Sequence, residues 1–223
     1  MGEKKCLVTQ NLIESVKWYM EAPTSIIKPE RGGDGVRTWK SKALQDLKDM
    51  LGRVPGEFGP EAMNGVNFEK KVYEFCNKED VKGSDHFKEV CSKVRGMQFY
   101  RKGGKDVKVG EYDCYVYAKY DAIQVPRIKD IKTTAKYTKN KYLGSIQHKL
   151  YCYVADANEF EYVIVEWKKF PEIKAVHSEW FTVPAESGTK YLEPEVHSAI
   201  IDCFDNLQNL DLWDLYRESY CLY

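Results

Sequence analysis

The sequence predicts a mixed α/β (α+β) fold whose core runs helix, three strands, helix, strand. An amphipathic helical segment at residues 65–75 precedes three strand-like segments rich in Tyr and Val. A second helical segment begins near residue 144, and a strand at residues 159–167 follows it. Strands alternating with helices in this way predict a central mixed sheet flanked by helices.

Length and composition are those of an ordinary globular chain. It has 223 residues, of which 43% are hydrophobic and 30% are charged, so an intrinsically disordered chain is excluded. We expect a single domain over residues 1–223, with an N-terminal helical lobe at 1–60, a core at 61–183 and a C-terminal helical region at 184–223. No apolar run can span a bilayer and no signal segment is visible, so we expect a cytoplasmic protein without membrane attachment.

The seven cysteines are scattered, and none forms a C-x-x-C pair. A zinc ribbon and a thioredoxin-like motif are therefore not expected. Scattered cysteines without an export signal indicate reduced thiols in a cytoplasm. We expect most of them to be buried as small apolar residues.

The N-terminal third is expected to be mostly helical. Asn11 can cap a short helix that ends near Pro23, and residues 40–51 form a one-sided helix. Residues 30–36 are glycine-rich, which is typical of a flexible loop or of a backbone nest for phosphate, but the lysine and Ser/Thr pattern of a P-loop is missing. Residues 54–60 form a linker with proline and glycine.

The central segments follow in order. The helix at residues 65–75 has Asn67 as a possible cap, and strands are expected at residues 97–101, 112–123 and 127–133. Glycines at 103, 104 and 110 bracket a turn region after the first strand, and Pro126 lies in the turn before the third.

The last third begins with a helix at residues 144–151, for which Ser145 can be the N-cap. Two strands at residues 159–167 and 173–183 form a hairpin around Pro171. An acidic, amphipathic helical region is expected at residues 192–215.

Charge is distributed unevenly although the net charge is zero. Residues 93–141 contain 13 Lys/Arg and 5 Asp/Glu, whereas residues 192–223 contain 7 acids and one arginine. Such asymmetry can direct an anionic ligand to one face, although a solvated charged surface has the same pattern. The basic segment surrounds the most informative motif of the chain.

That motif is Asp130-Ile131-Lys132. Because side chains alternate along a strand, the carboxylate and the ammonium share one face while Ile131 enters the core. If the preceding turn centres on Val125-Pro126, Asp121 lies opposite Asp130; one residue of shift places it opposite Lys132. In both registers the two acids and the lysine share a face of an antiparallel pair.

Two carboxylates this close destabilise each other unless a cation joins them, which is a physical argument for a metal. An acid that holds a divalent metal, beside a lysine that acts on a metal-bound water, is the minimal equipment for cutting a phosphodiester. Asp130 and Lys132 can also be a solvent-facing charge pair, and Asp121 an edge-strand acid.

The acids and the lysine belong to a longer ordered set: Phe68-Glu69 on the first helix, Asp121 on the second long strand, Asp130-Ile131-Lys132-Thr133-Thr134 on the next, and Gln147 with Tyr151 on the following helix. This ordered set resembles the PD-(D/E)XK nuclease superfamily, and among its members the RecB-like and phage-type (lambda-like) exonucleases. The resemblance covers roughly residues 8–168, including the N-terminal segment from Val8 to Leu12 with Trp18-Tyr19.

The resemblance implies a restriction-endonuclease-like αβββαβ core and a metal-dependent deoxyribonuclease. Asp121, Asp130, Glu69 and the Ile131 carbonyl would hold one or two Mg²⁺ or Mn²⁺ ions, and Lys132 would act on the attacking water. Gln147 and Tyr151 would position the DNA strand or the lysine. The residues expected to contact phosphates are Lys136, Lys139, Lys141 and Arg101.

The resemblance further implies an exonuclease of phage or prophage origin that works in DNA recombination or processing in the host cytoplasm. A single-strand annealing protein is an implied partner, and a homo-oligomer is a further possibility. Some RecB-like relatives hold an iron–sulfur cluster, but Cys203 and Cys221 are too few and too far apart, so no cluster is expected.

Three alternatives stay open. The first is a structure-specific endonuclease on the same fold. The second is a nucleic-acid-binding module without activity, and the third is an unrelated α/β protein in which these residues are surface charges. Taken singly, Glu69 is also explained as an acid in the first turn of a helix, and Gln147 and Tyr151 as ordinary helix residues.

Overall fold

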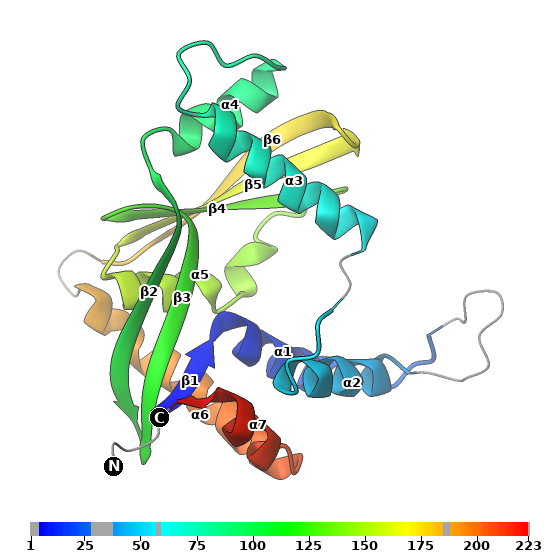
Figure 1. The fold of residues 1–223 in the computed structure, drawn as a ribbon, viewed down its shortest axis with the longest axis vertical. Coiled ribbons are helices and arrows are strands. Elements are labelled where there is room, and N and C mark those ends of the chain that lie inside the picture. The colour runs from blue at the N-terminus through cyan, green and yellow to red at the C-terminus, as the bar shows by residue number, and fades with distance from the viewer. Residues whose placement is uncertain (1–4, 28–37, 57–58, 185–187, 223) are drawn as a thin grey trace. The chain divides into compact units, whose positions relative to one another are not determined.

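The computed structural model describes residues 5–27, 38–56, 59–184 and 188–222 (Figure 1). The glycine-rich segment at residues 30–36 lies outside the described residues. The chain forms two compact units, of which the first combines Met1–Glu57, Lys105–Tyr117 and Glu195–Tyr223, and the second combines Phe58–Gly104 and Ala118–Pro194. The division into lobes suggested by the sequence stays a prediction.

The first unit contains two strands that were not predicted from the sequence, β1 (Lys5–Thr9) and β7 (Cys221–Leu222). β1 pairs in parallel with the first half of β3 (Tyr112–Gln124), with Cys6 opposite Cys114, and antiparallel with β7. The described part of the N-terminal third is mostly helical, as predicted, and β1 is the exception, because five residues are too few to show a strand period.

The helices of the first unit are α1 (Gln10–Glu21), α2 (Trp39–Leu51), α6 (Glu193–Asn209) and α7 (Trp213–Tyr220). Asn11 is not the cap of α1: the Thr9 hydroxyl accepts a hydrogen bond from the Leu12 backbone N–H, so α1 starts one residue before Asn11. The predicted helical region at residues 192–215 is two helices. The Tyr216 hydroxyl on α7 donates to the Leu7 carbonyl on β1, which holds the C-terminal helix to the strand.

The second unit has the predicted αβββαβ core, and the predicted fold class is confirmed. Its elements are α3 (Pro60–Phe75), α4 (Asp85–Val94), β4 (Arg127–Thr134), α5 (Gln147–Ala155), β5 (Glu159–Lys169) and β6 (Glu172–Thr182), together with parts of β2 (Gln98–Val109) and β3; short 3₁₀ turns lie at Tyr142–Gly144 and Gly188–Leu192. Helix α4, capped by the Ser84 hydroxyl, was not predicted.

Two predicted helix starts were wrong. α3 begins at Pro60 and not near Asn67, because a proline at the first helical position costs no hydrogen bond. α5 begins at Gln147, and the Ser145 hydroxyl accepts from the Gln147 backbone N–H without being the N-cap itself.

The turn region predicted between Gly103-Gly104 and Gly110 was wrong except at Gly110, since β2 continues through both earlier glycines to Val109. A Cβ atom at Gly103 would lie only 2.7 Å from the Tyr120 hydroxyl oxygen, so the glycine makes room for that ring. The turn between β2 and β3 is at Gly110, whose φ of 58° suits glycine.

Within the second unit the strands lie in the order β6-β5-β4-β3. Gln124 pairs with Arg127 across the Val125-Pro126 turn, so the first of the two predicted registers is correct and Asp121 comes opposite Asp130. β4 and β5 are parallel, with Asp130 beside Tyr162 and Lys132 beside Ile164. The predicted hairpin at Pro171 joins β5 and β6.

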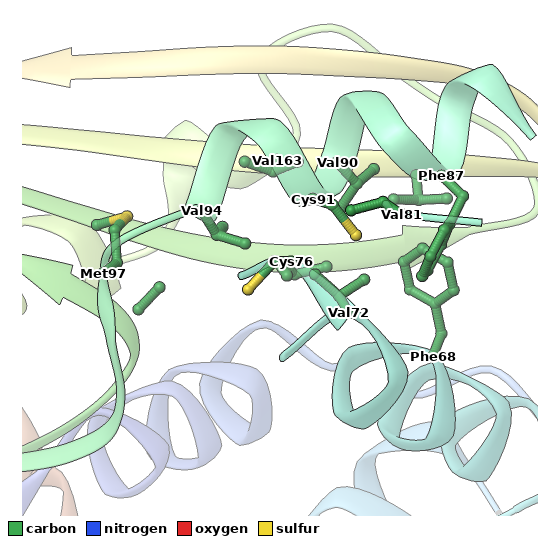
Figure 2. Packing of buried hydrophobic residues seen from close by; sticks show 13 residues of the cluster. Phe68, Val72, Cys76, Val81, Phe87, Val90, Cys91, Val94, Met97 and Val163 are labelled. Carbon is green, nitrogen blue, oxygen red and sulfur yellow. The ribbon is translucent and has the colours of Figure 1, made fainter. Parts of the chain in front are cut away.

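Helices α3 and α4 cover one face of β4, β5 and β6, and α5 lies against the other face (Figure 1). The α3–α4 side holds a cluster of buried apolar side chains that includes Phe68, Val72, Val90 and Val163 (Figure 2). Phe68 packs edge-on against Phe87, with ring centroids 6.0 Å apart. Alternation along β4 places Ile131 in this cluster and the flanking residues on the α5 side.

Helices of membrane-spanning length and apolarity are not found in the described part of the chain.

Candidate active site

Four elements of the second unit bring the predicted site residues together. Glu69 comes from α3, Asp121 from β3, Asp130 and Lys132 from β4, and Gln147 and Tyr151 from α5. α3 lies close to β4 because residue 65 is a glycine: a Cβ there would be 2.8 Å from the Thr133 hydroxyl oxygen. This close approach allows Glu69, one turn further along α3, to reach the carboxylates of the sheet.

Asp130 is the most buried acid of the site, at 2% exposure. The Gln147 side-chain amide donates a hydrogen bond to Asp130 Oδ1 at 2.7 Å. Lys132 Nζ is 2.7 Å from Asp130 Oδ2. This approach is an ion-pair contact outside hydrogen-bonding geometry, so Oδ2 accepts no hydrogen bond from the described residues. A buried carboxylate oxygen is therefore left with acceptor capacity.

Asp121 and Glu69 add two further carboxyl groups to the surroundings of Asp130. Burial, followed by the negative charges of Asp130 and Glu69, raises the pKa of Asp121 well above its ordinary value. Burial and the charge of Asp130 likewise raise the pKa of Glu69, and the Tyr73 hydroxyl and the ammonium of Lys132 act in the opposite direction. The three carboxyl groups thus repel one another, and protonation relieves that repulsion.

Lys132 is the cation that faces this negative charge. Burial alone would lower the pKa of Lys132, but the charges of Asp130 and Asp121 outweigh it and hold the pKa above its ordinary value. The ammonium also lies 6.0 Å from the centroid of the Tyr162 ring. Lys132 therefore stays charged at neutral pH and is directed at the carboxylates.

Gln147 and Tyr151 are both buried, at 6% and 8% exposure. The Tyr151 ring packs edge-on against Tyr120, with centroids 5.4 Å apart. Burial and the nearby charges of Asp130 and Asp121 raise the pKa of the Tyr151 hydroxyl. Gln147 contacts Asp130 directly, so its side chain holds a carboxylate in position from within the protein.

Three further residues that the sequence analysis did not assign belong to the surroundings of the carboxylates. They are Tyr73 on α3, Tyr100 on β2 and Lys119 on β3. Tyr73 follows Glu69 by four residues, so helical spacing places both on one face, a signal that the sequence did contain. Tyr100 has no such signal, because strand pairing brings it there.

The predicted phosphate contacts lie elsewhere. Lys136, Lys139, Lys141 and Arg101 are exposed, and within the described residues no hydrogen bond or ion pair joins them to the carboxylates. Glu179 anchors the loop that carries the three lysines, because its Oε1 accepts from the Tyr137 hydroxyl and from the Asn140 backbone N–H. The Ile131 side chain is in the apolar core, so its main chain alone can serve the site.

The donor chemistry of the site suits a hard divalent cation. Carboxylate and carbonyl oxygens are the ligands that Mg²⁺ and Mn²⁺ prefer, and the buried Asp130 Oδ2 has acceptor capacity left. In the described residues, however, no three His, Cys, Asp or Glu side chains already converge as metal ligands. The Lys132 ammonium stands 2.7 Å from Asp130 Oδ2 instead.

No protein-family model and no curated protein matches the chain. Among solved structures, it is similar to the crystal structure of SSO0001, with a TM-score of 0.52 and 12% identity over 91% of this chain and 77% of that one. A weaker likeness is a phage-related exonuclease from Haemophilus somnus 129PT, with a TM-score of 0.46 and 12% identity over 88% of this chain and 94% of that one. Another is an alkaline exonuclease from Laribacter hongkongensis, with a TM-score of 0.48 and 9% identity over 92% of this chain and 91% of that one. At 12% identity, the similarity to SSO0001 shows a shared fold alone.

Proposed function

We propose that this chain is a metal-dependent deoxyribonuclease that hydrolyses phosphodiester bonds in DNA. The observation that carries the proposal is the meeting of three mutually repelling carboxyl groups, Glu69, Asp121 and Asp130, with a charged lysine in one unit. A purely structural cluster would be expected to balance its charges. The excess of negative charge is accounted for if a cation completes the site.

Asp121, Asp130, Glu69 and the Ile131 carbonyl are the residues proposed to hold Mg²⁺ or Mn²⁺. Such an ion, when bound, supplies a more acidic water and neutralises charge on the scissile phosphate. We infer that Lys132 then turns from Asp130 toward the phosphate, where its ammonium orients the attacking water and offsets negative charge. The hydrogen bond from Gln147 keeps Asp130 Oδ1 engaged, which would leave Oδ2 as the oxygen available to hold a cation.

The finer assignment is an exonuclease that processes DNA for recombination, of phage or prophage origin. It rests on the resemblance to RecB-like and phage-type members of the superfamily. Lys136, Lys139, Lys141 and Arg101 are proposed to contact phosphates, which contributes affinity without sequence preference. A single-strand annealing protein as partner, a homo-oligomer and a cytoplasmic location belong to the same proposal. A structure-specific endonuclease and an inactive binding module are the alternatives.

The first experiment measures degradation of end-labelled linear DNA in Mg²⁺, in Mn²⁺ and in EDTA. The wild type is expected to degrade DNA with either ion, and Asp130→Asn and Lys132→Met are expected to be inactive while keeping the native circular dichroism spectrum. Lys168→Met is a matched control on an exposed lysine of β5 and should retain activity. Full activity of folded Asp130→Asn would refute the assignment.

The second experiment separates the alternatives by comparing linear with covalently closed circular DNA. An exonuclease spares the circle, an endonuclease cuts it, and an inactive binding module retards both in a gel without cutting either. Release of mononucleotides from one labelled end would also give the polarity of digestion.

A further inference from the structure

Three aromatic side chains of the second unit lie beside the carboxylates and form a group that we call the aromatic wall: Tyr73, Phe99 and Tyr100. Tyr73 and Phe99 are stacked, with ring centroids 4.2 Å apart and an interplanar angle of 22°. Tyr100 meets Tyr73 edge-on at 5.0 Å and 90°. The wall joins α3 to β2, and Tyr100 is its outermost member, with an exposure of 42%.

Tyr100 has an unusual backbone conformation for so large a residue. Its φ is +54°, in the left-handed region that favours glycine, although it lies within strand β2. Bulky residues persist in this region only where the surrounding structure holds them there, and such positions cluster at functional sites. A conformation of this kind points the ring where a regular strand would not direct it.

The Tyr100 side chain faces the proposed catalytic groups. After partial burial, the negative charges of Glu69 and Asp121 are the causes that raise the pKa of Tyr100 to about 12. Glu69 and Tyr73 are four residues apart on α3, so the same helix face carries a carboxylate of the site and the inner ring of the wall. The ammonium of Lys119 lies over one face of the Tyr100 ring, 5.4 Å from its centroid, so the opposite face is the one proposed to receive a ligand. An exposed aromatic ring, a cation and the site carboxylates are thus neighbours.

Other tyrosines near basic residues are already engaged. Tyr137, in the loop with Lys136 and Lys139, is stacked on His177 with centroids 3.9 Å apart. Tyr142 packs against the Tyr162 ring at 5.5 Å. Both are less exposed than Tyr100. Among these rings, Tyr100 therefore has the greatest area to offer a ligand.

We propose that Tyr100, backed by Tyr73 and flanked by Lys119, is a stacking subsite for one unpaired nucleobase of the strand that is cut. The inference rests on the proposed nuclease function and deepens it. A base inside a duplex has both faces covered by its neighbours, so a face is open to a tyrosine only where stacking is interrupted, in a single strand or at a duplex end. The substrate class at this site is accordingly single-stranded DNA or the frayed end of a duplex, with Lys119 near a flanking phosphate.

The experiment is a binding cycle with the full-length Lys132→Met chain in Mg²⁺, so that DNA is bound without being cut. A fluorescent single-stranded 12-mer is compared with oligonucleotides in which one nucleotide at a time is abasic. One position is expected to weaken binding about tenfold when its base is removed, the size of one base–aromatic stack. In the Lys132→Met/Tyr100→Leu chain, the abasic and complete oligonucleotides should bind equally at that position.

Two variants test specificity. Tyr100→Phe keeps the ring and should retain the abasic penalty, and Tyr137→Leu, which removes a tyrosine already stacked on His177, should retain it as well. A Tyr100→Leu chain with native thermal unfolding that still shows the full penalty overturns the subsite, as does binding with no sensitive position at all. If the parent chain binds no oligonucleotide and the wild type cuts none, the proposed function fails first and the subsite with it.

Discussion

The second unit contains two buried carboxylate clusters on opposite faces of the same pair of strands. Asp130 on β4 lies on the α5 side, whereas its neighbour Lys129 lies on the α4 side and pairs with Glu161 of β5. In both clusters a lysine stands 2.7 Å from a buried carboxylate oxygen that accepts no hydrogen bond from the described residues. The difference therefore lies in what surrounds each pair.

Glu161, which is fully buried, has two cations and a hydroxyl around it. Lys93 Nζ donates to Glu161 Oε1 at 3.1 Å, and the Ser178 hydroxyl donates to the same oxygen at 2.7 Å. Burial alone would raise the pKa of Glu161, but the contacts with Lys129, Ser178 and Lys93 outweigh it and the pKa is lowered. Folding therefore favours the charged form of this carboxylate.

Around Asp130 the balance is reversed, because Asp121 and Glu69 add negative charge and the pKa of both is raised. One cluster is thus satisfied by the protein itself, and the other is left with a charge excess that a ligand can neutralise. Burial of a carboxylate by itself therefore does not mark a site, whereas uncompensated like charges do.

Lys132→Met and Lys129→Met test this comparison most strongly, because the two lysines are three residues apart on opposite faces of β4. Lys132→Met is expected to lower the rate of DNA hydrolysis about 10²–10⁴-fold, since it removes the cation of the site. Lys129→Met should keep the rate per folded molecule within about twofold, because it is remote from the chemistry. Steady-state rates normalised to folded protein measure both, and equal losses would contradict the contrast.

In unfolding experiments Lys129→Met is expected to lose more stability than Lys132→Met, the reverse of their order in activity. Lys129→Met should lower the free energy of unfolding by about 2 kcal/mol, less than the loss for an isolated buried pair because Lys93 still contacts Glu161. Urea titrations followed by fluorescence give the value. A loss below about 0.5 kcal/mol, the range of ordinary surface substitutions, would show that the Glu161 cluster is not a stability element.

Mg²⁺ is expected to stabilise the wild type, because a cation that binds only the folded state raises its stability by mass action. At ten times the dissociation constant the gain is about 1.4 kcal/mol. Glu161→Gln should show the same gain and Asp130→Asn should show none, as thermal melts with and without Mg²⁺ will reveal. An equal shift in Asp130→Asn would place the cation elsewhere on the protein.

Asp121→Asn is expected to stabilise the metal-free protein by about 1 kcal/mol at pH 7.5 while abolishing hydrolysis. The pKa of Asp121 is raised above its ordinary value of 3.8 in the folded state, so its ionisation costs stability at pH values above 3.8. The advantage of the asparagine should shrink as the pH falls toward 3.8, because Asp121 takes up its proton in the folded state first, and it vanishes below 3.8, where Asp121 is neutral in both states. Melting temperatures between pH 4 and pH 8 test the sign, and a destabilised variant at pH 7.5 would contradict it.

Much of the proposed site was predictable from local patterns. A strand period of two places Asp130 and Lys132 on one face and Ile131 on the other, whatever packs against them. The turn at Val125-Pro126 allowed two registers, and both kept Asp121 on that face; the structure has the first. Strand periodicity and turn position depend only on residues close together in the chain, so both can be read from the sequence.

Other features depended on contacts between distant segments. β1 and β7 are short and are defined by pairing with each other and with β3, so neither showed a period of its own. Gly103 in β2 suggested a turn because its real reason is distant in the sequence: the Tyr120 ring, 17 residues further along the chain, needs the space where a Cβ atom would be. Tyr100 comes beside Glu69 only because β2 and α3 meet in the fold.

By itself, then, the sequence determined which residues share a face of a strand or a helix, because backbone periodicity alone controls this. It determined the acids, the lysine and their order along an αβββαβ core. Only the tertiary structure decided the charge balance around each of them: that Glu161 has two lysines and Asp130 has two further acids. The physical reason is that burial and electrostatic repulsion depend on distances in space, which residues far apart in the chain acquire only when it folds.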